Sequence, residues 1–539
     1  MRRGVSKPVF GNFVLDVLVL VSVAWAVVCF FKCNYSNGRP ILWGILYNDC
    51  ITNTFLTVTV YFVARLSFSI HFRWSKVLFY SLLFSFLLRE LYICSRQYML
   101  GNGEMVGSFG NTGLLGGFLT ICICIIGPLI MNNRSYVLLL LLLPVLLFVI
   151  MAFSRASWLC IVVVSFLLCM ERESIRTFIC SWKIPLLLIV SAMAMFVYFL
   201  KKESADSRLF MALVVLRYIP QIGLFGVGPG NYCGLYGRAL FDYFLGNECG
   251  FSDSSIGCLE ILTQGKISVG IPDYSYNETI RLLTETGFVG VAIITVVTIV
   301  TFLRLYKRRD PLSYGYLALI IFSQFSFPSA VPLFCCLFAI FIAAGASIKN
   351  EQSAGGIYPY LIICTILSVA VFCIGTNKKD ADFVNKECMY MHDSYELGFY
   401  DDACRIGESL YERGYASDLF MLEYGTSLCR NRDYVNCIKV LNHGMELSAS
   451  PTFWKIMGDN SFNSGDYSLA EKHYLHSFIM APNRMRPLLD LARLYYATGQ
   501  TEKLFCISDC STKMIPKVEN EKTKKMLEEI SALKSAVNK

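Results

Sequence analysis

The sequence predicts an all-α protein, in which a polytopic membrane bundle of about eleven helices is followed by an α-solenoid. Three observations predict this fold class. The 539 residues are 55% hydrophobic and only 16% charged, whereas soluble domains carry about 25% charged residues. Apolar runs dominate up to residue 376, and the rest of the chain has an ordinary charged composition. From residue 384 onward, a turn-and-helix pattern recurs with a period of about 34 residues.

The predicted membrane domain occupies residues 1–376. A helix needs roughly 20 mostly apolar residues to cross a bilayer. The candidate spans lie near residues 13–31, 50–66, 75–93, 113–131, 135–152, 156–170, 184–200, 284–303, 313–328, 331–347 and 357–375. The first span is not a cleavable signal peptide, because residues 30–33 read Phe-Phe-Lys-Cys and offer no small-residue cleavage site.

The distribution of Lys and Arg in the short loops predicts the orientation. One set of loops is rich in these residues: Arg2, Arg3, Lys7, Arg65, Arg73, Lys76, Arg134, Arg172, Arg176, Lys183, Arg304, Lys307, Arg308, Arg309 and Lys349. The opposite short loops carry little beyond Lys32, Arg39, Arg89, Arg96 and Arg155. We therefore expect a cytoplasmic N-terminus, with the large loop 201–283 and the C-terminal domain on the outer side. The net charge of +8 follows from this rule and gives no reason to invoke nucleic acid.

The cysteines and histidines give little indication of metal chemistry. Many of the 22 cysteines fall inside predicted spans, where they serve as small apolar residues. Cys233, Cys249 and Cys258 lie in the outer loop, where an oxidising compartment would permit one disulfide, although unpaired thiols are an equal reading. With five histidines in the chain and no paired CxxC motifs, we predict no metal and no cofactor.

The C-terminal domain, residues 384–539, contains four similar blocks, each a turn followed by a helix with a small residue at a packing position. The blocks begin at Gly398, Arg432, Gly465 and Gly499, and Pro451 and Pro482 fall where helix pairs would end. This period resembles the tetratricopeptide repeat. Such units must stack to bury their apolar faces. We therefore expect a scaffold that binds a protein partner or stabilises a complex, with a capping helix at residues 513–539.

Two polar motifs precede predicted spans on the outer side. Residues 107–113 include Asn111 and suit a tight turn into a helix, whose free amides could meet an anion. The alternative is a plain cap. Arg155 lies between two nearly contiguous spans, where an ionisable residue is a functional candidate. The alternative is an arginine that extends its side chain to lipid phosphates.

Two further motifs lie in the large loop. Residues 209–216 are too short to cross the bilayer and read as a helix on the outer leaflet, preceded by Arg208 and ended by Arg217. Gly226, Gly228 and Gly230 follow; without a preceding strand they are no dinucleotide fingerprint, and they indicate a tight turn or close approach to a ligand.

The last motif enters the eighth span, where Asn277, Arg281 and Glu285 share one helical stripe at the water–lipid boundary. Such a stripe indicates a cavity, with a solvated Arg281–Glu285 ion pair as the alternative. Taken together, outward-facing arginines beside a lipid-accessible cleft suit a diphosphate, because guanidinium groups pair bidentately with phosphate oxygens.

These motifs, in this order and over residues 90–330, resemble the bacterial O-antigen ligase superfamily, which also includes O-antigen polymerases and protein O-oligosaccharyltransferases. The resemblance implies a GT-C-like, metal-independent membrane glycosyltransferase of lipopolysaccharide or polysaccharide biosynthesis. It would move a glycan from undecaprenyl diphosphate to an acceptor hydroxyl on the periplasmic face of the bacterial inner membrane. The acceptor would be the lipid A core, a growing glycan or a protein Ser/Thr.

The resemblance also assigns roles to residues. Arg155 and Arg208 would hold the diphosphate, and Tyr276 stands where the family has a histidine ahead of Asn277. Because a tyrosine hydroxyl is a weak general base near neutral pH, Asn277, Glu278 and Glu285 are substitutes for that role. The remaining substrate-binding candidates are Asn111, Arg217, Gly226, Gly228, Gly230 and Arg281.

Three alternatives stay open at this point. One is a polysaccharide polymerase of the same superfamily. Another is a glycan or lipid transporter, since transporters use interrupted spans with polar groups near the midplane. A third is a non-enzymatic assembly platform, although a simple anchor would need only one span.

Overall fold

The structure is a computed structural model. It describes residues 10–32, 49–101, 105–133, 136–173, 202–247, 272, 274–347, 357–375, 378–514, 516 and 519–537, together with six isolated positions between 176 and 199. Within these residues every regular element is helical, as the sequence predicts. The chain divides into two compact units. The bundle unit comprises residues 1–29, 49–202 and 275–375, and the array unit comprises residues 30–48, 203–274 and 376–539.

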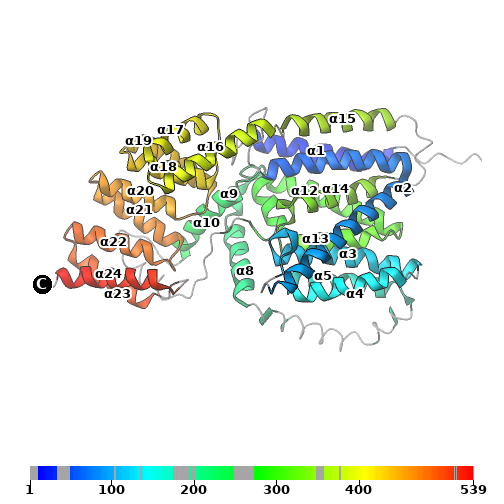
Figure 1. Cartoon of the computed structure of the whole chain (residues 1–539), viewed down its shortest axis with the longest axis horizontal. Helices are drawn as coiled ribbons and strands as arrows, with labels where there is room; N and C mark the ends of the chain where they lie inside the picture. The colour runs from blue at the N-terminus through cyan, green and yellow to red at the C-terminus, as the bar shows by residue number, and fades with distance from the viewer. Residues whose placement is uncertain are drawn as a thin grey trace, which may run out of the picture. The chain divides into compact units, whose positions relative to one another are not determined.

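The bundle unit is built from long apolar helices. They are α1 (Phe10–Lys32), α2 (Asp49–Met99), α3 (Thr112–Asn133), α4 (Tyr136–Met151), α5 (Arg155–Met170), α12 (Glu278–Lys307), α13 (Leu312–Ser323), α14 (Pro332–Ala346) and α15 (Ile357–Gly375), with short 3₁₀ turns η1 (Gly107–Phe109) and η2 (Pro328–Ala330). Helix α2 packs along α14 and α15, and α3 packs against α4, α5 and α13 (Figure 1). Helix α3 lies at the centre of this unit, with Leu115, Phe118, Leu119 and Cys122 fully buried.

Among the described residues, four helices are long and apolar enough to cross a membrane: α1, α2, α3 and α12. Helices α4, α5, α13, α14 and α15 contribute shorter apolar stretches. Large apolar side chains on the outside of the unit, such as Leu140 at 69% exposure and Leu143 at 62%, suit a lipid environment better than water. A membrane protein is therefore the natural reading. The predicted span at 184–200 lies outside the continuously described residues.

The connection between the second and third predicted spans is tighter than expected. In place of a short loop with Arg65 and Arg73, α2 consists of two helices joined across a kink at His71 (φ −142°, ψ 77°), which lies between the predicted spans 50–66 and 75–93. Arg65 is not a loop residue at all, because its side chain is fully buried. Its guanidinium contacts Asp16 at 3.3 Å and the hydroxyls of Ser69 and Ser347 at 2.6 and 3.0 Å. Burial is tolerated because the charge is paired and hydrogen-bonded.

Polar contacts join distant parts of the chain at each end of the bundle. Segments at or beside the predicted cytoplasmic side are joined by three pairs: Lys76 with Asp310, Glu171 with Tyr314, and Arg308 with Ser347. Segments at or beside the predicted outer side are joined by three others: Asn53 with Ser329, Ser329 with Glu278, and Gln324 with Asn277.

The array unit contains the helices of the large loop and those of the C-terminal region. The loop helices are α8 (Lys202–Arg217), α9 (Ile219–Ile222) and α10 (Tyr232–Asn247). The C-terminal helices are α16 (Lys378–Glu396), α17 (Tyr400–Glu412), α18 (Asp418–Arg430), α19 (Tyr434–Leu447), α20 (Thr452–Asn463), α21 (Tyr467–Met480), α22 (Met485–Ala497), α23 (Thr501–Lys513) and α24 (Glu521–Val537). We refer to α16–α24 as the helical array. Each of its helices packs against the next one along the chain (Figure 1).

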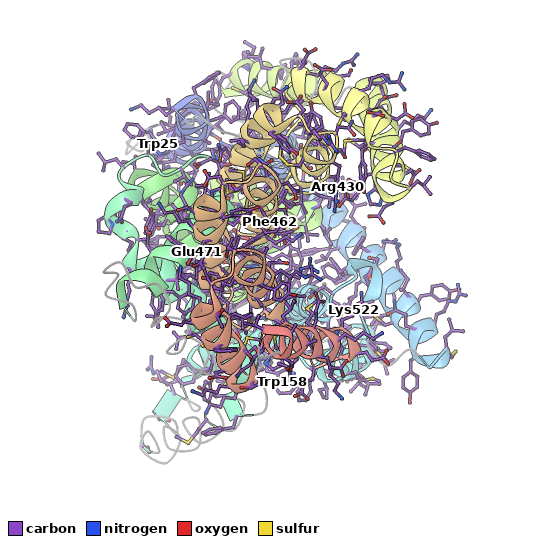
Figure 2. The ribbon with its side chains drawn as sticks, turned by 90° about the vertical axis from the view of Figure 1, so that its left-hand side faces the viewer. Trp25, Trp158, Arg430, Phe462, Glu471 and Lys522 are labelled. Carbon is purple, nitrogen blue, oxygen red and sulfur yellow. A yellow bond between two sulfur atoms is a disulfide. The ribbon has the colours of Figure 1, made fainter. Side chains whose placement is uncertain are left out.

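The four sequence blocks of the array all form a turn and then a helix, as predicted. The first residue of each block adopts a positive φ: Gly398 at 80°, Arg432 at 64°, Gly465 at 85° and Gly499 at 68°. The packing position of each block is fully buried. Ala403, Cys437 and Ala470 fit the expected small residue, whereas the fourth block has the larger Leu504. Cross-helix ties secure the layers; for example, Glu471 (labelled in Figure 2) accepts hydrogen bonds from Tyr495 and Lys503, both at 2.8 Å.

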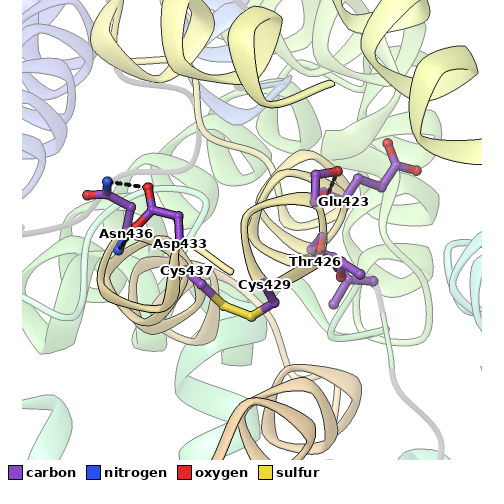
Figure 3. Close-up of a disulfide and its surroundings, with 8 residues drawn as sticks. Glu423, Thr426, Cys429, Asp433, Asn436 and Cys437 are labelled. Carbon is purple, nitrogen blue, oxygen red and sulfur yellow. Dashed lines mark hydrogen bonds between the residues drawn. A yellow bond between two sulfur atoms is a disulfide. The ribbon is translucent and has the colours of Figure 1, made fainter. Parts of the chain in front are cut away.

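The second block differs from the others because it contains a disulfide. Cys429, near the end of α18, is bonded to Cys437 of α19 across the intervening turn (Figure 3). In the same turn, Asp433 caps α19 by accepting hydrogen bonds from the backbone and side-chain nitrogens of Asn436 at 3.2 and 2.7 Å. The sequence indicates a possible disulfide only among Cys233, Cys249 and Cys258 of the large loop, and no pattern in it indicates the Cys429–Cys437 bond.

Candidate functional site

The eleven residues that the sequence singles out fall into both units. Six belong to the bundle unit: Asn111, Arg155, Tyr276, Asn277, Arg281 and Glu285. Five belong to the array unit: Arg208, Arg217, Gly226, Gly228 and Gly230.

Asn111 begins α3 as its N-terminal cap. Its side-chain oxygen accepts hydrogen bonds from the backbone nitrogens of Gly113 and Leu114 at 2.8 and 3.2 Å. The preceding turn η1 is held by Glu90 of α2, which accepts from the backbone nitrogen and the hydroxyl of Ser108 at 2.9 and 2.6 Å. Glu90 is fully buried. The motif is therefore a hydrogen-bonded turn. The Asn111 side chain caps α3, which was the alternative to anion binding at this turn.

Arg155 is the first residue of α5, and its side chain is partly buried. Helix α3 approaches this helix start closely. A Cβ atom at Gly116 would lie 2.7 Å from Cβ of Ser154 and 2.8 Å from Oγ of Ser157, so only glycine fits there. Trp158, labelled in Figure 2, packs edge-on against Phe153 at 5.1 Å between ring centroids. The N-terminal turns of α3 and α5, with Asn111 and Arg155, are thus neighbours.

The Tyr276–Asn277 pair forms the entry to α12. Tyr276 has a φ of 51°, unusual for a residue with a side chain, and its ring packs edge-on against Phe327 at 5.3 Å. Asn277 caps α12: its oxygen accepts from the backbone nitrogen of Ile280 at 2.9 Å, and its nitrogen donates to the Gln324 carbonyl at 3.0 Å. Both ends of the Asn277 amide are therefore engaged in holding the entry to α12.

Arg281 lies between two carboxylates on the first turns of α12. Its Nε is 2.9 Å from Glu278 Oε2, and its Nη1 is 4.0 Å from Glu285 Oε2. The side chains of Arg281, Glu278 and Glu285 are only 14%, 10% and 4% exposed, so the pair with Glu285 is not the solvated ion pair considered from sequence. Glu278 also accepts from the backbone nitrogen of Ser329 at 3.1 Å. The charge of Arg281 is therefore already balanced by the protein.

Helix α12 is broken directly after this cluster. Gly287 has φ 68° and ψ −171°, a conformation essentially confined to glycine. The break separates a polar first segment, residues 278–286, from the apolar remainder of α12. The carbonyl of Thr286, at the break, accepts a hydrogen bond from Nε1 of Trp25 in α1 at 2.9 Å (Trp25 is labelled in Figure 2).

Aromatic contacts join the two halves of this end of the bundle. Phe109 of η1 packs against Phe334 of α14 at 5.9 Å, and Phe334 stacks on Phe322 of α13 at 5.8 Å. Phe322 in turn leaves no room for a Cβ atom at Gly117 of α3. All six bundle-unit candidates therefore lie at the same end of the bundle. Asn111 is next to Arg155 at the start of α5, and the other four candidates lie on α12 or just before it.

In the array unit, Arg208 and Arg217 lie on one helix. The predicted surface helix at 209–216 is part of the longer α8, which places Arg208 in its middle and Arg217 at its last position. The guanidinium carbon of Arg217 lies 4.9 Å from the ring centroid of Tyr243 in α10, a cation–π contact. Arg208 is partly buried.

The three glycines form the turn between α9 and α10. Gly226, Gly228 and Gly230 have φ angles of 71°, 97° and 85°, so the prediction of backbone that must turn tightly is confirmed. Asn231, which follows them, is buried and donates to the carbonyl of Val227 at 3.0 Å. This turn leads the chain directly into α10.

The remaining predictions for the loop concern cysteines and metals. Cys233 contacts the carbonyl of Pro272 at 3.4 Å and is not in a disulfide, while Cys249 and Cys258 lie outside the described residues. Within the described ranges, no group of three or more His, Cys, Asp or Glu side chains could hold a metal ion.

Sequence reasoning missed two buried acids. Glu90, which fixes the turn before α3, and Asp16, which pairs with Arg65, are both fully buried. Each is a single acidic residue inside a long apolar run. That context was the available indication, because an ionisable residue in a membrane segment is rarely incidental.

The comparisons with known proteins do not add to this picture. A scan of the sequence against models of protein families finds no match, and a search among curated proteins finds none either.

Proposed function

We propose that the protein is a membrane glycosyl- or oligosaccharyltransferase that moves a glycan from undecaprenyl diphosphate to an acceptor hydroxyl. One observation carries the proposal. The N-terminal turns of α3 and α5 meet at Gly116 and Ser154, with Arg155 on the first turn of α5, at the end of the bundle that also holds the polar start of α12. The N-terminus of α5, to which Ser154 donates no side-chain cap, and the Arg155 guanidinium are groups that bind phosphate oxygens.

In the proposed reaction the acceptor oxygen attacks the anomeric carbon of the lipid-linked glycan. A new carbon–oxygen bond forms as the bond to the diphosphate breaks, and the diphosphate leaves with its electron pair. Arg155 and Arg208 stabilise the charge that develops on it. The acceptor proton passes to a carboxylate, for which Glu285 is the candidate, since its distance to Arg281 is longer than that of Glu278. No metal or cofactor takes part in this scheme.

The finer architecture belongs to the same proposal. We propose about eleven spans, a GT-C-like bundle, and a tetratricopeptide-like solenoid for the helical array, on the periplasmic side of a bacterial inner membrane. The Cys429–Cys437 disulfide supports an outer location for the array, since disulfides persist in oxidising compartments. The charge of the loops supports the same orientation.

The proposal is tested with purified protein in liposomes and a lipid-linked glycan donor. We expect Arg155→Ala and Arg208→Ala each to lower kcat/KM by at least about a hundredfold, as loss of a transition-state charge contact does. The matched control is Arg405→Ala, which removes an arginine that is 78% exposed from the array and should leave transfer unchanged. Full transfer by both variants would reject the assignment, provided that they insert as the wild type does.

One observation favours a second function, the transport of a glycan or lipid. The break of α12 at Gly287, next to the partly buried Arg281 and the buried Glu285, resembles the interrupted helices of transporters. Movement of the intact lipid-linked donor across liposomes, without glycan transfer to any acceptor, would favour this reading. A polymerase of the same superfamily would instead extend a glycan acceptor in the transfer assay.

A further inference from the structure

Helix α10 of the large loop packs onto the helical array at unusually short range. Its sequence places Gly234 and Gly237 three residues apart, on one helical face. A Cβ atom at Gly234 would lie 1.8 Å from the carbonyl oxygen of Glu446, and one at Gly237 would lie 2.9 Å from Cα of Ala449. Only glycine permits this approach, so the two positions are matched to the C-terminal end of α19.

The next turns of α10 extend the same contact. Arg238 forms an ion pair with Glu446 of α19. Phe241 stacks on His476 of α21 with 3.5 Å between ring centroids, and His476 stacks on Trp454 of α20 at 3.6 Å. One face of α10 therefore contacts the array through close backbone packing, an ion pair and ring stacking. Tyr236 and Leu240 of α10 are at most 1% exposed.

Helix α10 also packs against α8. Phe210 of α8 packs against Tyr243 at 5.2 Å and Phe244 at 6.0 Å, and Arg217 lies over the Tyr243 ring. Helix α8, which carries Arg208, therefore packs on a helix that itself packs on the array. The other side of α8 presents Leu209, Leu213 and Leu216, which are 59%, 47% and 44% exposed.

We propose that the surface formed by α19 and α21 is an intramolecular receptor for α10, so that the array fixes the position of α8 and Arg208. The occupant of this surface is the chain's own loop. The part that concerns Arg208 rests on the proposed transferase function, whereas the docking of α10 does not.

The docking is tested in the full-length protein with the substitutions Arg238→Cys and Glu446→Cys, at the two partly exposed side chains that form the ion pair. Both glycines of the close approach stay in place. We expect this pair to be joined by a short bifunctional thiol reagent at least about tenfold faster than a control pair, because docking raises the effective concentration. The control is Arg238→Cys with Val435→Cys, since Val435 is 79% exposed and lies about 16 Å from Glu446 along α19.

Mass spectrometry of the joined peptides reads the result. Equal rates for the two pairs would overturn the docking. To identify the occupant, the two cysteines are placed on separately tagged copies: a bond between copies would show that α10 of a second molecule fills the surface, which overturns the intramolecular assignment.

The consequence for Arg208 is tested with Arg238→Glu, which repels Glu446, and with the charge swap Arg238→Glu/Glu446→Arg. We expect Arg238→Glu to raise KM for the lipid-linked donor several-fold with little change in kcat, and the swap to restore KM. An unchanged KM in Arg238→Glu would overturn the positioning role. If the wild type transfers no glycan at all, the proposed function fails, while the cross-linking result still decides the docking.

Discussion

The indole nitrogen of Trp25 donates a hydrogen bond to the carbonyl of Thr286 at 2.9 Å, one residue before α12 is broken at Gly287. A broken helix leaves carbonyl groups without their usual partners. In an apolar surrounding such groups must be satisfied from elsewhere. Trp25 satisfies one of them, and α1 thereby holds the segment that carries Arg281 and Glu285.

Replacing Gly287 by alanine should disturb this arrangement. A side chain at φ 68° and ψ −171° costs about 1–3 kcal/mol, so the two segments of α12 would realign. We expect Gly287→Ala to lower thermal stability in detergent and to abolish transfer. Gly127→Ala is the control, because Gly127 has an ordinary φ and open space around its Cβ position. Equal behaviour of the two variants would contradict a role for the break.

Arg281 and Arg155 should differ in the kind of defect that they cause. Arg281→Ala leaves Glu278 and Glu285 buried without their cation, and breaking such a cluster costs about 3–5 kcal/mol. We expect a sharp drop in the amount of folded protein, measured by size-exclusion chromatography in detergent. Arg155→Ala should leave that amount unchanged and reduce transfer alone. Loss of transfer with normal folding in Arg281→Ala would instead place Arg281 on the substrate.

The buried pair of Asp16 and Arg65 should act as a unit. Asp16→Asn leaves the Arg65 charge unbalanced, and we expect a loss of about 3–5 kcal/mol in stability. The double variant Asp16→Leu/Arg65→Met removes both charges and should be less damaging than the single one. Thermal unfolding in detergent measures both, and a double variant that is worse than the single one would argue against a paired structural role.

Arg432 occupies a position where the other three blocks have glycine. Its φ of 64° costs about 1–2 kcal/mol for a residue with a side chain. Because Arg432 is exposed, Arg432→Gly loses no buried contact and should slow hydrogen exchange in residues 428–440. Gly465→Ala, the reverse change at the equivalent position of the third block, should speed exchange locally. Faster exchange in Arg432→Gly would show that its side chain makes a compensating contact.

The contact between Phe241 and His476 predicts a pH dependence. Burial, with a smaller effect of nearby His473, lowers the pKa of His476 from 6.5 to about 3. A lowered folded-state pKa gives stability that is present above pH 6.5 and lost as the pH falls toward 3. Between pH 7.5 and pH 5 we expect a loss of at most about 2 kcal/mol. His476→Phe keeps the stacking without a titrating group, so its melting temperature should fall less. Parallel curves for both proteins would contradict the assignment.

Much of this fold could be predicted from sequence, because hydrophobic runs and repeated turns are local patterns. Four helices of the array, α17, α19, α21 and α23, begin after Gly398, Arg432, Gly465 and Gly499, where the pattern places them. The capping of α12 by Asn277 follows from the same local rules.

The ion pairs between residues far apart in the chain could not be predicted from the sequence. Asp16 and Arg65 are 49 residues apart, and Arg238 and Glu446 are 208 apart, so no periodicity links them. The glycines of α10 could be read as helix weakeners, but not as a match to the end of α19. The grouping of the large loop with the helical array has the same origin, since it depends on surfaces that meet only after folding.

The bridge between Cys429 and Cys437 closes over the one turn in which Arg432 replaces glycine. In the other three blocks the backbone reaches this shape through glycine alone. In the second block the disulfide holds Arg432 in a backbone conformation that disfavours residues with a side chain. Reduction of this disulfide by thiols should therefore destabilise the second block before its neighbours. Protein prepared under reducing conditions should be least stable at this turn.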